Sequence, residues 1–152
     1  MQGDIGAAVA AVAERYVGIR EIPAGSNRGE HIDRWNREVG NPIGSPWCAA
    51  FACCAAREAG VEHGPWTGSS GEVANWGERT GSGVSGGDVC AGCLGAVINP
   101  ETATGHCHTV VAVSGPDSDG VIDTVEGNEG NAVRRNRRHA DTVDWVVPWG
   151  PE

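Results

Sequence analysis

The chain has 152 residues, which is enough for a single domain with a hydrophobic core, expected over residues 1–152, and too few for two. Its formal net charge of −9 argues against nucleic acid and against anionic membrane surfaces as partners. No stretch approaches the roughly 20 apolar residues that a spanning helix needs, so we expect no membrane insertion.

The first part of the chain predicts two helices. Asp4 is suited to cap the first one, because apolar residues recur behind it at helical spacing as far as Val17. A second, short helix carries Ile32 and Trp35 on one side and stops at Gly40.

The segment 45–60, SPWCAAFACCAAREAG, predicts a third helix with clear ends. Ser45 suits the cap, Pro46 suits the first helical position, and Gly60 suits the stop. The many alanines indicate very close packing against another element. Residues 69–79 predict a further short helix.

From residue 86 onward the texture changes to short β-type runs separated by Gly, Pro, Asp and Asn. The runs lie at residues 87–98, 108–113, 120–128, 132–138 and 142–149, and the basic stretch 134–138 alternates like an exposed strand face. Helices first and strands second predict an α+β fold, with the N-terminal helices packed on an antiparallel β-sheet.

Cysteine chemistry offers the first functional clue. We expect mostly free thiols, because a chain of this length needs no disulfide framework and shows no export signal. Cys48 falls in the first turn of its predicted helix, where unpaired N–H groups and the helix dipole favour the thiolate. Cys53 and Cys54 lie one to two turns further in, where they pack as small apolar side chains.

A nucleophilic cysteine needs a base and a group that orients the base. His106 and His108 lie at the entry to a strand, in GHCHTVVAV, whereas the other three histidines lie in polar stretches. One strand later, Glu126 and Asn128 share a face at i, i+2. Two neighbouring strands are therefore expected to present an imidazole beside a carboxylate or amide.

Three motifs in this order resemble the CHAP-type amidase/peptidase family, which belongs to the papain-like cell-wall cysteine hydrolases. They are PWCAAF opening a helix, GH before an apolar strand, and EGN on the next strand. The upstream GIREIPAGSNRGEHIDRW is also similar to the N-terminal part of many such domains. The resemblance covers the chain from about residue 17 to 148 and implies a papain-like fold.

The resemblance implies a peptidoglycan hydrolase that cleaves an amide bond, as an amidase or an endopeptidase, through a thioester and without a cofactor. Cys48 would be the nucleophile, a histidine the base, and Glu126 or Asn128 the orienting group. We favour His108 as the base because HTVVAVSG makes a strand of the usual length, and His106 is the alternative.

Cys90 and Cys93 in C-x-x-C spacing, followed by His106 and His108, form an alternative zinc site. A zinc-stabilised module, or a relative that binds cell wall without cutting it, is the competing function. An amidase with an intracellular substrate is a third.

The expected partner is peptidoglycan, with no nucleic acid partner, and we expect a monomer. The N-terminal residues read as an amphipathic helix rather than a signal peptide. Action on the cell wall would then need release of the kind that phage lysins use, or another export route.

Overall fold

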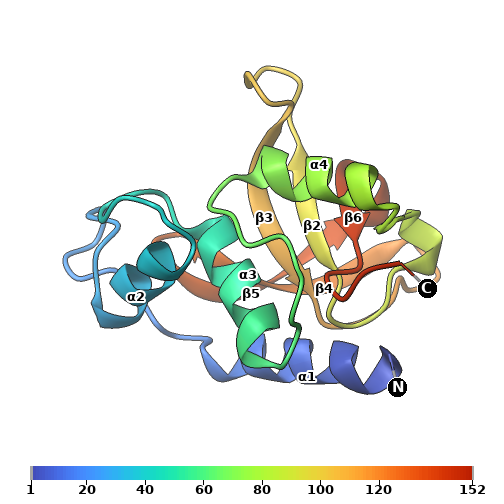
Figure 1. Ribbon diagram of the computed structural model, residues 1–152, viewed down its shortest axis with the longest axis horizontal. Coiled ribbons are helices and arrows are strands. Elements are labelled where there is room, and N and C mark those ends of the chain that lie inside the picture. The colour runs from blue at the N-terminus through green and yellow to red at the C-terminus, as the bar shows by residue number, and fades with distance from the viewer. Residues whose placement is uncertain (1, 152) are drawn as a thin grey trace.

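The computed structural model describes residues 2–151, with side chains described from Asp4 onward. Four α-helices precede most of the sheet: α1 (Gln2–Arg15), α2 (Glu30–Glu38), α3 (Cys48–Glu58) and α4 (Ser70–Thr80). Figure 1 shows α3 and α4 lying over the sheet, with α2 further out beyond α3. Within the described residues, no helix combines the length and apolar character that a membrane span requires.

Six strands form one antiparallel sheet. They are β1 (Gly83–Val84), β2 (Leu94–Ile98), β3 (His106–Ala112), β4 (Val121–Glu129), β5 (Ala132–His139) and β6 (Val143–Val146), with short 3-10 turns η1 (Gly86–Asp88) and η2 (Ala140–Thr142). Their order across the sheet is β1-β6-β2-β3-β4-β5, and every pairing is antiparallel. This architecture confirms the predicted α+β class and is consistent with the papain-like fold.

Alternation along the strands separates two apolar cores. Leu94, Val111 and Val125 join the core that contains the buried alanines of α3. Val110 and Ile122 belong to a second core with Trp145. Because the central strands β2, β3 and β4 contribute side chains to both cores, they form a rigid support for the residues at their ends.

The third helix begins later than the sequence predicts. Its N-cap is Trp47, without a side-chain capping bond, and Cys48 is its first helical residue. Ser45 and Pro46 lie outside the helix, and the Ser45 hydroxyl donates to the carbonyl of Pro42 at 2.6 Å. The prediction of a Ser45 cap was wrong, because the hydroxyl satisfies a local turn instead.

Two other boundaries also differ from the prediction. Asp4 lies within the first turn of α1 rather than at its cap. Residues 90–93 form a turn, so the β-run predicted at residues 87–98 becomes a strand only at Leu94. The helix predicted at residues 69–79 is confirmed as α4, and Ser69 caps it by accepting from the Glu72 N–H at 3.3 Å.

The strands β3 and β4 pair over a short length and then separate. Only Val111–Val125 and Ala112–Thr124 are partners among the described residues. Beyond them, the start of α3 packs on β4 at Gly127, where an added Cβ would meet the ring and Cβ of Phe51 at 2.9 and 2.7 Å. This close approach positions the N-terminus of α3 at the splayed ends of the two strands.

Candidate active site

Cys48 occupies the position in α3 where a thiolate is most stabilised. As the first helical residue, it lies beside backbone N–H groups that have no partner within the helix, at the positive end of the dipole. Its side chain is half-buried, and its sulfur lies 3.9 Å from the Ser70 hydroxyl. Ser70 is fixed in turn by a 2.6 Å hydrogen bond with the buried Thr109.

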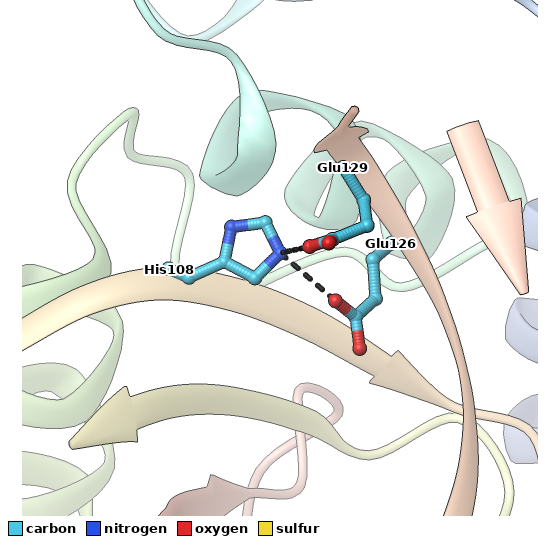
Figure 2. Close-up of side chains that lie close together, drawn as sticks. All are labelled: His108, Glu126 and Glu129. Carbon is cyan, nitrogen blue, oxygen red and sulfur yellow. Dashed lines mark hydrogen bonds and ion pairs between the residues drawn. The ribbon is translucent and has the colours of Figure 1, made fainter. Parts of the chain in front are cut away.

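His108 comes from the start of β3 and points both ring nitrogens at functional groups. Nε2 lies 3.0 Å from a carboxylate oxygen of Glu126 and 3.5 Å from one of Glu129. Figure 2 shows both contacts, with Nδ1 on the opposite side of the ring. Because Nε2–H donates to the carboxylates, Nδ1 is the atom available to exchange a proton with the Cys48 sulfur.

The ionisation of this pair favours a thiolate and an imidazolium. Burial alone would raise the pKa of the Cys48 thiol, but hydrogen bonding and charge from His108 bring that pKa below its ordinary value. Burial works against the charged imidazole too, yet Cys48 and Glu126 together raise the pKa of His108 to about 10. The mutual attraction of sulfur and ring contributes to both shifts, and Glu126 adds to the shift of His108.

Glu126 is a fully buried carboxylate with several donors. It accepts from Thr124 at 2.6 Å and from Nε and Nη2 of Arg138 at 2.9 and 2.6 Å, in addition to His108. Asn136 adds a longer contact of 3.4 Å. Burial would raise the pKa of Glu126, but these partners, Arg138 foremost, hold it well below the ordinary range.

Asn128 does not share this position, although the i, i+2 spacing predicts that it would. It adopts a positive φ of 58°, and the register of β4 against β5 shifts between Glu126 and Glu129. No hydrogen bond joins Asn128 to His108 among the described residues, and the second carboxylate at the ring belongs to Glu129. Sequence reasoning missed Glu129 and Arg138, because a bulge and a cross-strand contact leave no periodic signal.

The alternative base, His106, lies elsewhere. Its Nε2 pairs with Asp144 of β6 at 2.8 Å. Together with Asn75 and Glu78 of α4, the pair lines a separate pocket of about 350 Å³. The imidazole that faces Cys48 is therefore that of His108.

The four side chains of the alternative zinc site do not converge. Cys90 and Cys93 lie with their sulfurs 3.7 Å apart beside the end of β3, since the carbonyl of Cys93 accepts from Ala112 N–H. His106 pairs with Ile98 at the opposite end of the β2–β3 ladder, roughly 15 Å along the strands. Within residues 2–151, the one group that offers clustered ligand atoms is His108, Glu126 and Glu129.

The cysteines further along α3 have the surroundings of packing residues. The Cys53 thiol donates to the carbonyl of Pro65 at 2.7 Å, and burial raises the pKa of Cys53 to about 12. Cys54 donates weakly to the Trp35 carbonyl, and burial raises its pKa as well. All six cysteines lie in the described part of the chain and none forms a disulfide.

The residue before Cys48, Trp47, is part of the interior. Trp47 is fully buried and its indole N–H donates to Glu21, which is itself 3% exposed, at 2.8 Å. This buried pair anchors the residue before Cys48. Trp47 thereby helps to hold the start of α3 in place.

Fold and site together describe an α+β protein of papain-like arrangement with a Cys–His–Glu constellation. No protein family matches the chain by sequence, and no curated protein does. Its fold is similar to that in the crystal structure of Ly7917 with the hydrolyzing product of MDP, at a TM-score of 0.54 and 15% identity over 95% of this chain. The chain spans 63% of the length of that neighbour. A second Ly7917 structure matches 68% of this chain and 53% of that one, at 24% identity and a TM-score of 0.43.

Proposed function

We propose that this protein is a CHAP-type cysteine amidase or endopeptidase that hydrolyses an amide bond of peptidoglycan. The observation that carries the proposal is the placement of the Cys48 sulfur at the tip of α3, opposite the His108 ring that Glu126 holds. Nucleophile, base and orienting carboxylate are the three parts that thiol-dependent acyl transfer requires.

The reaction follows from these positions. The Cys48 thiolate attacks the amide carbon, and first-turn N–H groups of α3 stabilise the negative charge on the carbonyl oxygen. His108 gives a proton to the leaving amine nitrogen as the C–N bond breaks, which leaves a thioester on Cys48. The neutral imidazole then takes a proton from water, and the resulting hydroxide attacks the thioester to release a carboxylate and restore the thiolate.

The choice of peptidoglycan rests on two supports. The motifs PWCAAF, GH and EGN resemble cell-wall hydrolases. PWCAAF and EGN supply Cys48 and Glu126 of this site, and its histidine, His108, lies two residues after the histidine of GH. The fold neighbour Ly7917 was solved with a hydrolysis product of MDP, so the same architecture accompanies hydrolysis there. The proposal treats residues 1–152 as one catalytic domain of this kind.

Digestion of purified peptidoglycan, with the products read by mass spectrometry, tests the proposal. Wild type is expected to create new amino and carboxyl termini, and Cys48→Ala is expected to lower the rate by several orders of magnitude. Cys53→Ala is the matched control in the same helix, and it should retain the rate apart from any packing defect.

Comparison of His108→Ala with His106→Ala assigns the base. The first variant should lose activity as Cys48→Ala does, while the second should remain within about tenfold of wild type, since its ring pairs with Asp144. Equal inactivity of wild type and Cys48→Ala on several wall types would contradict the enzyme proposal and favour a binding module.

A further inference from the structure

We propose that Glu129 and Arg138 are positioning residues, which act with Glu126 as a two-carboxylate, one-guanidinium clamp on the His108 ring. The proposal rests on the proposed function, because His108 is there the catalytic base. Nε2 of His108 faces both carboxylates, at 3.0 Å from Glu126 and 3.5 Å from Glu129 (Figure 2).

A β-bulge makes the second carboxylate possible. Residues three apart on a regular strand point to opposite faces of the sheet. Here Glu126 pairs with Arg134 and Glu129 pairs with Ala132. Glu129 is thus three residues along β4 from Glu126, while their partners are only two residues apart on β5. The inserted residue turns Glu129 to the same side as Glu126 and brings it to the ring.

Arg138 makes the pair of carboxylates stable. Two glutamates beside one ring nitrogen would repel each other without a cation between them. The Arg138 guanidinium donates twice to Glu126, at 2.9 and 2.6 Å, and its Nη2 reaches Glu129 at 3.4 Å. The planar fork of arginine suits this bridging geometry, which the single ammonium of lysine cannot reproduce.

The neighbouring Arg137 shows that this role is specific to one face of β5. Arg137 points to the other face, where it pairs with Asp117 and Asp123 at 2.8 and 2.9 Å. Its side chain is 62% exposed, against 23% for Arg138. The two arginines therefore provide a matched pair for mutagenesis.

The clamp has a chemical consequence for the ring. A carboxylate on each side of Nε2–H fixes which nitrogen carries that proton, and it restrains rotation of the imidazole away from Cys48. Glu129 also adds negative charge near the ring, which favours the imidazolium that must protonate the leaving amine.

The experiment compares Glu129→Gln, Arg138→Met, Arg138→Lys and the control Arg137→Met in the full chain. In Glu129→Gln the alkaline limb of kcat should move to lower pH by about half to one unit, with KM unchanged within about twofold. Arg138→Met should lower kcat by about 10- to 100-fold at unchanged KM, and Arg138→Lys should recover part of the loss. Arg137→Met should stay within about twofold of wild type.

Nuclear magnetic resonance titration of the His108 ring provides a readout that needs no substrate. In Glu129→Gln the midpoint of the His108 titration should also move to lower pH. That result supports the clamp even if the wild type cleaves no wall substrate, and in that case only the proposed function fails. An unmoved ring titration and alkaline limb in Glu129→Gln would overturn the role of Glu129. Equal kcat values for Arg138→Met and Arg137→Met would overturn that of Arg138.

Discussion

Cys48 and Cys53 lie in one helix but meet different surroundings. Cys48 sits at the helix tip beside His108, and Cys53 is buried with its thiol donating to a carbonyl. The first pKa is lowered and the second is raised to about 12. Thiolate content, and with it nucleophilicity, therefore separates the two residues at neutral pH.

This difference predicts selective alkylation. Iodoacetamide should modify Cys48 with a pH midpoint below 9, the ordinary thiol value, while Cys53 should stay unmodified in the folded protein. Peptide mapping by mass spectrometry distinguishes Cys48 from the exposed Cys90 and Cys107. His108→Gln should move the Cys48 midpoint upward, and a midpoint that stays in place would contradict the ion pair.

The individual residues of the site could be predicted only where a local rule applies. Cys48 stands out because a proline and a run of small apolar residues mark a helix start. Glu126 stands out because it lies one strand after the histidines, on a predicted face shared with Asn128 at i, i+2. Nothing local marks Arg138, since its contact with Glu126 depends on the pairing of β4 with β5.

At the scale of elements, the contact between α3 and β4 determines the geometry of the site. The start of α3 lies on Gly127, one residue after Glu126. A side chain there would push the helix tip away from the strand that carries the carboxylate. A single glycine therefore couples the position of the proposed nucleophile to that of the Glu126 carboxylate.

Gly127→Ala should accordingly lower both stability and activity. Its Cβ would lie 2.7 Å from the Cβ of Phe51, and the overpacking should cost about 1–3 kcal/mol in free energy of unfolding. Urea denaturation and kcat are the measurements. Gly87→Ala is the control, because an added Cβ there meets nothing within 4 Å, and a similar loss in both variants would contradict the coupling.

The elements themselves were predicted more completely than their ends. Periodicity placed four helices before the strands, and the structure has them there. The start of α3 shifted because Ser45 bonds to a nearby carbonyl, and the bulge at residues 126–129 replaced Asn128 with Glu129 at the ring. The first difference arises from a local hydrogen bond and the second from an inserted residue in the β4–β5 ladder, and hydrophobic periodicity records neither.

For the whole molecule, the buried Glu126 links stability to pH. Its folded pKa is depressed below the ordinary value of 4.5, so the ionised carboxylate contributes stability above that pH. The contribution is lost as pH falls from there toward the folded value.

Glu126→Gln should therefore be strongly destabilised at pH 7, by about 3–5 kcal/mol, because it leaves the Arg138 charge half-buried and poorly paired. The difference in free energy of unfolding between this variant and wild type should become smaller below pH 4.5. Thermal unfolding measured at a series of pH values tests this. The control Asp123→Asn removes the exposed partner of Arg137 and should cost less than about 1 kcal/mol at either pH. A difference in free energy of unfolding between wild type and Glu126→Gln that does not change with pH would contradict the link between Glu126 ionisation and stability.

The proposed clamp would make activity depend on the β4–β5 hairpin, and β5 is an edge strand of the sheet. Edge strands open more readily than central ones. Fraying of β5 after Val133, where its residues are exposed or half-buried, would release Arg138 while the core residues of β2, β3 and β4 stay packed. Heat inactivation would then precede the loss of helical circular dichroism. The highest temperature at which the protein works would be set by the stability of the edge strand β5 rather than by that of the apolar cores.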